Sequence, residues 1–252
     1  MKLAIIILAA GKGTRMESDL AKVLHPLCGK ALISHVLESI APLNATQTIA
    51  IVGHQAQDVA AHVAASFPDV EFATQSPMLG TGHAVQFAQP LMPDLDGDVI
   101  VLCGDAPLVQ TETLRQLIEL RRKNHAPASM MVAVAMEAGS YGRVVVSEDG
   151  RVTKIVEARD ATPEVLALRT VNAGTYCFER RALWDGLARL QTDNVQGEYY
   201  LTDVIGFMNQ QGGRVEALFV SQREMTGVNT RAQLQALEEE LRASGECESA
   251  AA

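Results

Sequence analysis

The stretch LAIIILAAGKGTRM, residues 3–16, carries the strongest structural signal in this 252-residue sequence. Residues 3–9 form a short continuous apolar run, which is typical of a strand buried on both faces of a parallel sheet. The run passes directly into a loop with two glycines, one lysine and one arginine. Glycines let main-chain N–H groups approach phosphate oxygens, and the two cationic side chains neutralise phosphate charge. The stretch therefore predicts a strand followed by a phosphate-binding loop.

Two familiar nucleotide-binding loops do not fit this stretch. A dinucleotide-binding fingerprint needs a third glycine, and Met16 stands at that position. A P-loop needs an upstream glycine and a hydroxyl residue after its Gly-Lys pair, and neither Gly11-Lys12 nor Gly29-Lys30 has them. The loop is therefore predicted to belong to another class of phosphate site.

Short apolar runs alternate with helical patterns on the carboxyl side of this loop, across the first half of the chain. The alternation predicts an α/β fold, a Rossmann-like and mostly parallel sheet with helices on both faces. The expected strands are 3–9, 48–52, 70–74 and 98–103, and the expected helices are 31–42, 55–66, 81–89 and one that begins at Thr111 as N-cap.

The pattern changes after residue 126, where closely spaced strand patterns predict a mixed, β-rich lobe on the other side of a cleft. The expected strands are 128–136, 143–147, 151–157, 171–178 and 214–219, and the expected helices are 180–189, 199–211 and 230–243. An Asp-Gly turn at 149–150 joins two of these strands as a hairpin. We predict one two-lobed domain over residues 1–229, with a nucleotide-binding core at about 1–126, and a C-terminal helix and tail at 230–252.

Composition and charge exclude several classes of protein. Hydrophobic residues make up 48% of the sequence and charged residues 20%, which excludes a disordered chain. The net charge of −9 disfavours a protein that coats nucleic acid or anionic lipid, because both partners require a basic surface. The amino-terminal apolar run is short for a signal peptide and far too short to span a membrane. The four cysteines are far apart and form no C-x-x-C pair, which suits a reducing cytoplasm. We therefore predict a cytoplasmic protein without nucleic-acid or membrane partners, and the sequence leaves the oligomeric state open.

A second candidate for chemistry is Asp105, which follows the expected strand 98–103. Ligands of open α/β sheets bind at the edge formed by the carboxyl ends of the strands. The loop after strand 3–9 and the residue after strand 98–103 should both lie at that edge. Magnesium takes one or two carboxylates together with substrate phosphates, so Asp105 is a candidate metal ligand.

Further short motifs accompany the opening loop in a fixed order along residues 3–240. They are Lys22-Val23-Leu24, Gly29-Lys30, Gln75 with Leu79-Gly80-Thr81-Gly82-His83-Ala84, Gly104-Asp105 with Pro107-Leu108, Tyr141-Gly142-Arg143, Ile155-Val156-Glu157, Asn172-Ala173-Gly174, Gly197-Glu198-Tyr199-Tyr200-Leu201-Thr202-Asp203 and Gly227-Val228-Asn229. The series resembles the sugar-1-phosphate nucleotidyltransferases. In detail it is similar to the uridylyltransferase domains of the bacterial bifunctional N-acetylglucosamine-1-phosphate uridylyltransferase/glucosamine-1-phosphate acetyltransferase family.

The resemblance implies an activity and a set of site residues. The activity is transfer of uridylyl from UTP to N-acetylglucosamine-1-phosphate with release of pyrophosphate, dependent on Mg²⁺ with Mn²⁺ as an alternative. The product, UDP-N-acetylglucosamine, is a peptidoglycan precursor. The implied catalytic residues are Arg15, Lys22 and Asp105, and the implied metal ligands are Asp105 and Asn229. The implied substrate contacts are Leu8, Ala9, Ala10, Gly11, Gly13, Thr14, Gln75, Gly80, Thr81, Cys103, Gly104, Gly142, Glu157, Asn172, Glu198, Tyr199 and Asn229.

The sequence departs from the pattern of this family in three places. Ala21 stands where a proline is usual before the signature lysine, and Cys103 stands where a tyrosine is expected. Nothing after residue 230 resembles the hexapeptide repeats of an acetyltransferase, so we expect this chain to transfer no acetyl group. Two other readings stay open: a nucleotidyltransferase for another sugar-1-phosphate or nucleotide, and a non-catalytic nucleotide-sugar binding module. Whichever reading holds, we expect Arg15 and Lys22 to face solvent in the empty crevice.

Overall fold

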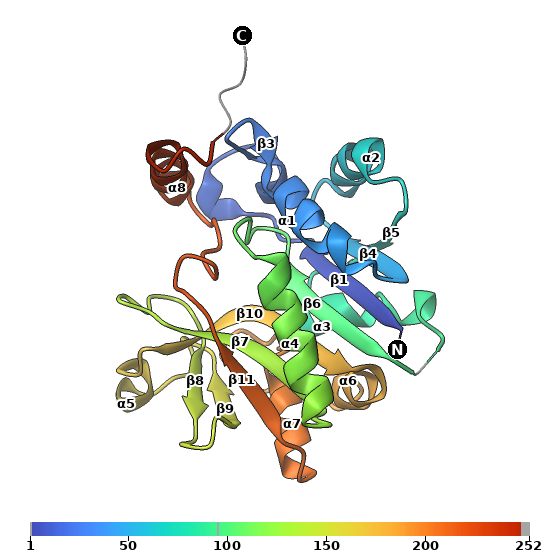
Figure 1. The fold of residues 1–252 in the computed structure, drawn as a ribbon, viewed down its shortest axis with the longest axis vertical. Coiled ribbons are helices and arrows are strands. Elements are labelled where there is room, and N and C mark those ends of the chain that lie inside the picture. The colour runs from blue at the N-terminus through green and yellow to red at the C-terminus, as the bar shows by residue number, and fades with distance from the viewer. Residues whose placement is uncertain (1, 95, 248–252) are drawn as a thin grey trace.

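A single twisted sheet organises the chain, as the computed structural model of residues 2–94 and 96–247 shows (Figure 1). Strands β6, β1, β4 and β5 run parallel to one another, β10 runs antiparallel to both β6 and β7, and β11 is parallel to β7. The order across the sheet is β11-β7-β10-β6-β1-β4-β5. The bounds are β1 (Leu3–Ala9), β4 (Gln47–Val52), β5 (Val70–Thr74), β6 (Asp98–Cys103), β7 (Ala128–Val134), β10 (Thr170–Glu179) and β11 (Val215–Phe219). The predicted α/β fold with a mostly parallel sheet is confirmed.

Helices cover both faces of this sheet, which explains why β1 is apolar at every position. Ile5 and Ile7 pack into the cluster that holds α1 (Leu32–Ile40), α2 (Ala56–Ser66) and α4 (Thr111–Lys123). Ile6, which points to the opposite face, packs with α3 (Thr81–Gln86), α6 (Arg180–Leu187) and α7 (Asp203–Gln210). All three isoleucines are fully buried. A strand with two covered faces has no solvent side, so it cannot alternate polar and apolar residues.

The β-rich lobe is built on an extension of the central sheet. The hairpin of β8 (Arg143–Val146) and β9 (Val152–Val156) pairs with β10, and α5 (Pro163–Leu166) follows it. Asn209 of α7 donates its side-chain amide to the carbonyl of Val152 at 2.9 Å, which fixes the hairpin to the helix layer. The lobe therefore shares the sheet of the nucleotide core.

Two local predictions are wrong in detail. The helix expected at 199–211 begins at Asp203, because Tyr199 uses its main-chain N–H and carbonyl to pair with Leu79 and Gly82. Thr111 is the first helical residue of α4 and not its N-cap, which is Gln110. The Thr111 hydroxyl donates to the carbonyl of Ser39 at 2.6 Å and so joins α4 to α1. Both differences come from contacts between segments far apart in the sequence.

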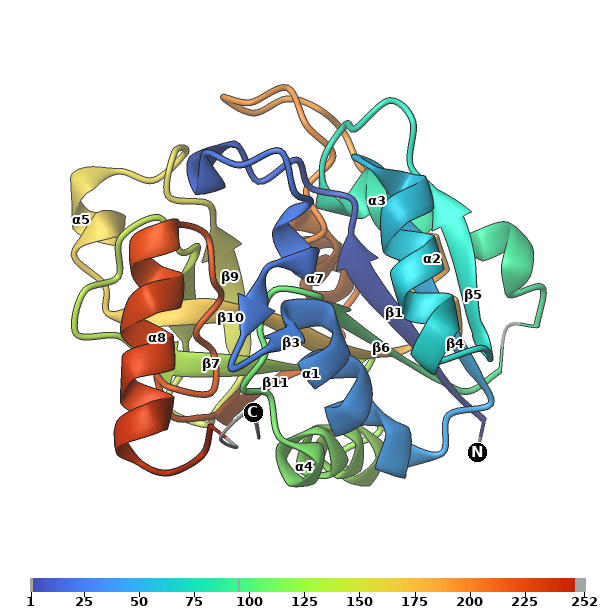
Figure 2. The same cartoon turned by 90° about the horizontal axis from the view of Figure 1, so that it is seen from above.

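The C-terminal helix α8 (Arg231–Ala243) packs beside a short hairpin, β2 (Pro26–Leu27) and β3 (Lys30–Ala31), and beside the loop after β1 (Figure 2). A separate apolar cluster joins these segments, made of Met16, Leu27, Leu32, Val228, Leu237 and Leu241. The remaining helical segments are short 3-10 turns at Thr14–Met16, Lys22–Leu24, Ala41–Leu43 and Gln89–Leu91. The end of the predicted tail, residues 248–252, lies outside the described residues. Among the helices that are described, none has the length and apolar character needed to cross a bilayer.

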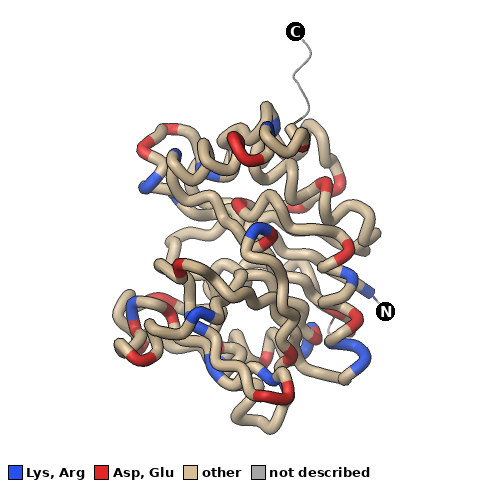
Figure 3. Tube along the Cα trace, turned by 60° about the vertical axis from the view of Figure 1, so that its left-hand side comes forward, with Lys and Arg blue, Asp and Glu red and all other residues tan. Residues whose placement is uncertain are grey.

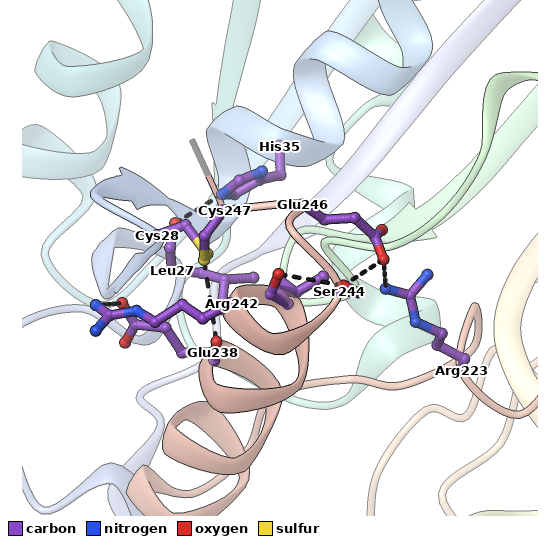
Figure 4. Close-up of a disulfide and its surroundings, with 10 residues drawn as sticks. Leu27, Cys28, His35, Arg223, Glu238, Arg242, Ser244, Glu246 and Cys247 are labelled. Atoms are coloured by element: carbon purple, nitrogen blue, oxygen red, sulfur yellow. Dashed lines mark hydrogen bonds and ion pairs between the residues drawn. A yellow bond between two sulfur atoms is a disulfide. The ribbon is translucent and has the colours of Figure 1, made fainter. Parts of the chain in front are cut away.

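A disulfide joins Cys28, in the turn of the β2–β3 hairpin, to Cys247 just beyond α8 (Figure 4). Their Cα atoms lie 5.3 Å apart, a separation that a disulfide spans. The wide spacing of the four cysteines gave no expectation of this bridge, and the other two cysteines, Cys103 and Cys177, are free. The two bridged residues are 219 positions apart, so no local spacing of cysteines in the sequence predicts the bridge.

Candidate active site

The loops that carry the predicted residues rise above one edge of the sheet (Figure 2). They follow β1 and β5 and include the segment before α7, and they enclose a cavity of about 280 Å³. The predicted residues that line this cavity are Leu8, Ala9, Ala10, Gly11, Lys22, Gln75, Gly80, Thr81, Cys103, Asp105 and Glu198. Sequence reasoning missed Met78, a half-exposed apolar side chain in the wall of the cavity. The edge predicted from strand topology is therefore the edge where the cavity lies.

The phosphate-binding loop leaves β1 and folds back over Lys22. Gly13 adopts a left-handed backbone with φ of 63°, and a Cβ at that position would lie 2.6 Å from the Cβ of Lys22. Both the backbone conformation and the close approach require glycine there. Gly11 and Lys12 are exposed, and Thr14 lies with Lys12 beside a second, wider cavity of about 830 Å³. The loop therefore offers main-chain groups and cationic charge to a ligand from outside the sheet.

Four predicted side chains meet at the rim of the 280 Å³ cavity. The Lys22 ammonium pairs with the Asp105 carboxylate and also donates to Asn229 Oδ1 at 3.2 Å. Arg15 Nη2 donates to the same Asn229 oxygen at 3.0 Å. The main-chain N–H of Val228 donates to the carbonyl of Asp105 at 2.9 Å and holds the last segment beside β6. Residues from both ends of the chain thus form one charged cluster.

The oxygen atoms of this cluster suit a divalent cation. Asp105 supplies a carboxylate and Asn229 an amide oxygen, the hard donors that Mg²⁺ prefers. Two cationic side chains, Lys22 and Arg15, already contact these oxygens, so the position favours positive charge. Within the described residues no group of three or more His, Cys, Asp or Glu side chains could hold a metal by itself. A metal here would therefore take its remaining ligands from substrate phosphates and water.

The wall formed after β5 is ordered by a network around Gln75. Its side-chain amide is buried and donates to the carbonyl of Gly80 at 3.0 Å and to His83 Nδ1 at 3.1 Å. Gly80 has φ of 106°, and a Cβ there would lie 2.7 Å from the carbonyl oxygen of Tyr199. The Thr81 hydroxyl accepts from the N–H of Leu201 at 3.1 Å. The network fixes this wall of the cavity. Sequence reasoning missed His83 as one of its supports, and burial lowers the pKa of His83.

The remaining wall residues are positioned by their main chains. Glu198 lines the cavity from a loop that Asn194 braces, by donating its side-chain amide to the Glu198 carbonyl at 2.6 Å. Tyr199 stacks on His83 and does not line the cavity. Gly104 is buried behind the wall, where its N–H donates to the carbonyl of Leu8 at 3.0 Å. Glu198 is therefore part of the cavity surface, whereas Tyr199 and Gly104 lie outside the lining and support it.

Gly142, Glu157 and Asn172 form a neighbouring cluster in the β-rich lobe. The N–H of Asn172 donates to the Gly142 carbonyl at 2.9 Å, and the Thr202 hydroxyl donates to Glu157 Oε1 at 3.0 Å. Burial, as the largest cause, raises the pKa of Glu157. Cys103 joins the cluster to the cavity, because its Sγ lies 3.8 Å from the carbonyl of Gly174. These three predicted substrate contacts therefore lie together, next to the cavity but outside its lining.

Cys103 lines the cavity, but its thiol is not activated as a nucleophile. Burial, the largest cause, and the nearby Asp105 carboxylate raise its pKa to about 12. The thiolate is the reactive form of cysteine, so a raised pKa keeps the side chain inert. Cys103 thus serves as part of the wall.

The expectation that Arg15 and Lys22 both face solvent holds for Arg15 and is wrong for Lys22. The Lys22 side chain is only 16% exposed and that of its partner Asp105 13%, whereas Arg15 is exposed. The Lys22 ammonium lies between the side chains of Asp105 and Asn229, which shield it from solvent. The two cations should therefore contribute differently to the stability of the free protein.

We expect Lys22→Ala to lower the Tm by several degrees and Arg15→Ala to leave it within about 2 °C. Loss of Lys22 leaves a largely buried carboxylate without its partner, at about 1–3 kcal/mol, and each kcal/mol shifts the Tm of a chain this long by roughly 2–4 °C. An exposed side chain such as Arg15 contributes within about 0.5 kcal/mol. Calorimetry or thermal unfolding followed by circular dichroism measures both. Lys30→Ala, which removes an exposed lysine paired with Glu38, is the control; a Tm for Lys22→Ala equal to the control would contradict the structural role of Lys22.

Charges elsewhere on the molecule are mixed. Acidic and basic residues are interspersed along the trace in the view of Figure 3. The cationic side chains of the site, Arg15 and Lys22, are therefore a local feature of a chain whose net charge is −9. A small anionic ligand can bind such a site without a basic surface.

Comparison with known proteins agrees with this geometry. Residues 5–211 match the family model described as MobA-like NTP transferase domain. The chain is 45% identical over 238 residues to the bifunctional protein GlmU of Exiguobacterium sibiricum and 46% identical over 233 residues to that of Geobacter metallireducens. These alignments cover 94% and 92% of this chain but 52% and 49% of the relatives, so the chain spans about half the length of the curated relatives it matches.

Solved structures share the fold at low sequence identity. A UDP-glucose pyrophosphorylase complexed with UDP-glucose superposes with a TM-score of 0.79 at 17% identity, covering 97% of this chain and all of that one. The inositol-1-phosphate CTP transferase from T. maritima superposes with a TM-score of 0.75 at 16% identity, covering 99% and 97%. The overall architecture, including the β-rich lobe, is therefore common to these structures and this chain.

Proposed function

The chain belongs to the MobA-like NTP transferase family, and on that basis we propose that it transfers the uridylyl group of UTP to N-acetylglucosamine-1-phosphate, giving UDP-N-acetylglucosamine and pyrophosphate. The observation that carries the proposal is the cluster of Arg15, Lys22, Asp105 and Asn229 at the rim of a cavity that the glycine-rich loop lines. The similarity of this chain to the GlmU proteins, over nearly its whole length, supports the choice of nucleotide and sugar.

The reaction needs charge stabilisation more than it needs a base. The second pKa of a phosphate monoester is about 6, so the attacking sugar phosphate is already an anion near neutral pH. The barrier lies in bringing two polyanions together and in stabilising charge on the leaving pyrophosphate, which cations and aligned N–H groups do. A bound Mg²⁺, or Mn²⁺ as an alternative, would supply Lewis-acid charge at Asp105 and Asn229. Arg15, Lys22 and the main chain of the loop from Gly11 to Thr14 would hold the phosphates for in-line attack.

The two other groups of residues would divide the remaining recognition between them. Gln75, Gly80 and Thr81, which line one wall of the cavity, would face the uracil ring, with Leu8, Ala9 and Ala10 along the nucleoside. Glu157, Asn172 and Gly142 would hydrogen-bond the sugar, with Glu198 and Tyr199 nearby. The adjacency of the cavity and the sugar cluster through Cys103 supports this division, because a sugar phosphate and a nucleotide must meet at one phosphorus atom.

The setting of the reaction is part of the same proposal. We place the transferase domain at residues 1–229, with the nucleotide core at about 1–126 and a C-terminal extension at 230–252. We place the protein in the cytoplasm, as a source of a cell-wall precursor. Within the part of the chain that the structure describes, the Cys28–Cys247 bridge counts against this location, because structural disulfides are rare in a reducing compartment.

A pyrophosphate-release assay with four nucleoside triphosphates and a panel of sugar-1-phosphates tests the proposal. UTP with N-acetylglucosamine-1-phosphate should give the largest kcat/KM. A larger value for another pair would identify a different nucleotidyltransferase on the same site. Pyrophosphate release from no pair, with folded protein and Mg²⁺ present, would favour a non-catalytic nucleotide-sugar binding module.

A further inference from the structure

We infer that Arg231, the first residue of α8, is a positioning residue that holds the phosphate-binding loop in its active shape. Its guanidinium donates to two successive main-chain carbonyls at the end of that loop, through Nε to Met16 at 2.8 Å and through Nη2 to Glu17 at 2.7 Å. Arg231 is more than 210 positions away from both residues in sequence. The inference rests on the proposed function for its kinetic consequence, but not for its structural one.

The loop needs an external support at this point. Glu17 has a left-handed backbone with φ of 48°, a conformation that residues other than glycine rarely adopt. Such a residue keeps its conformation only where the surroundings fix it. The loop itself supplies two turn hydrogen bonds, from Met16 N–H to the Gly13 carbonyl at 2.8 Å and, longer, from Glu17 N–H to the Thr14 carbonyl at 3.3 Å, and both leave the carbonyls of Met16 and Glu17 free to accept. The fork of Arg231 is the contact that holds the two carbonyls from outside.

Arg15 lies directly between the supported and the ligand-facing parts of the loop. The Met16 side chain is fully buried in the apolar cluster with Leu237 and Leu241 of α8, while its carbonyl accepts from Arg231. Arg15, one residue earlier, is exposed and reaches Asn229. The direction of the Arg15 side chain therefore depends on a backbone that α8 holds on two sides.

The support is itself firmly attached. Thr230 and Gln233 form a capping box at the start of α8, and Gln233 Oε1 also accepts from the N–H of Asn229 at 2.8 Å. At the other end, the Cys28–Cys247 bridge joins the segment after α8 to the β2–β3 hairpin (Figure 4). A helix fixed at both ends presents Arg231 in one place. The C-terminal helix is thereby a structural part of the phosphate site.

Two variants of Arg231 separate positioning from simple charge. Lysine keeps the positive charge but cannot donate to two carbonyls with the planar fork of arginine. A positioning role predicts that Arg231→Ala and Arg231→Lys both lower kcat/KM for UTP, by roughly ten- to hundred-fold, as for a small misplacement of reacting groups. The KM for the sugar phosphate should stay unchanged. If Arg231→Lys keeps the wild-type kcat/KM while Arg231→Ala loses it, the residue acts by charge and the inference is wrong.

Hydrogen exchange of the free protein gives a readout that does not depend on the substrate. The Met16 and Glu17 amides, in the peptide covering 11–20, should exchange at least about tenfold faster in both variants, with the α8 peptide unchanged. Arg242→Ala, which removes an exposed arginine of the same helix paired with Glu238, should change neither the exchange nor the kinetics. Unchanged exchange of the loop in Arg231→Ala would overturn the inference. Faster exchange without any uridylyl transfer by the wild type would leave it standing and contradict the proposed function instead.

Discussion

Replacing Asp105 by asparagine is expected to lower the kcat of nucleotidyl transfer by at least about 10²-fold, the effect of losing one preorganised electrostatic contact. The substitution keeps the size of the side chain and one oxygen, and it removes the negative charge. Asp105 lies where Lys22 and Asn229 converge, so its charge holds the Lys22 ammonium in place. A metal bound there would lose its only carboxylate from this cluster. The measurement is pyrophosphate release at saturating substrates and Mg²⁺.

The control for this variant is a carboxylate outside the site. Asp69 is exposed in the turn before β5, and Asp69→Asn should keep the wild-type kcat. Circular dichroism of both variants verifies that they are folded. Full turnover of the wild type in excess EDTA would contradict the metal role of Asp105 and Asn229. A kcat of Asp105→Asn within a few-fold of the wild type would contradict a catalytic role for its charge.

The position of Asp105 could be predicted because it depends on strand topology alone. In a parallel sheet, the segments after β1 and β6 must leave from the same edge, so residues about ninety positions apart meet without any further information. Strands β1 and β6 could also be predicted from their apolar runs, because both faces of each strand are covered. The position of Asn229 in the same cluster could not be predicted from a strand pattern; it was implied only by the resemblance to the nucleotidyltransferases.

The features that sequence reasoning missed depend on contacts over long distances. The main chain of residues 199–202 could have continued the helix of α7, but Tyr199 pairs with Leu79 and Gly82 instead. Lys22 looks like a solvent-facing phosphate ligand, and its burial follows only from the meeting of Asp105 and Asn229 around it. The same holds for the Cys28–Cys247 bridge, whose partners are brought together by the docking of α8. Periodicity reports local burial, and it does not report which distant segment supplies the partner.

N-acetylglucosamine-1-phosphate is expected to be used better than glucosamine-1-phosphate, by roughly ten- to hundred-fold in kcat/KM with UTP. Asn172 donates its side-chain amide to the Tyr176 hydroxyl at 2.6 Å and accepts from the N–H of Gly174 at 2.9 Å. The amide therefore has one donor and one acceptor position left, which match the carbonyl and N–H of an acetamido group. Without the acetyl group these two positions of the partly buried Asn172 side chain stay unpaired.

The charge of Glu157 sets the size of this preference. A protonated amine on glucosamine-1-phosphate would be attracted by the ionised carboxylate and so recover part of the lost binding. Burial raises the pKa of Glu157, so lowering the pH toward that pKa protonates the carboxylate and removes the attraction. The preference for the acetylated sugar should therefore widen as the pH falls. It should also widen in Glu157→Gln, which keeps the shape of the side chain without its charge, and not in Glu164→Gln, an exposed carboxylate of α5.

The decisive comparison is kcat/KM for the two sugars under the same Mg²⁺ and UTP concentrations, across pH. Equal values, or a preference for the free amine, would show that Glu157 and Asn172 do not form the acetamido pocket. A preference that is independent of pH and of the charge at Glu157 would place the selection with Asn172 alone. Because only the sugar is changed, KM for UTP should be the same with either acceptor, which separates recognition of the acetyl group from any change at the nucleotide cavity.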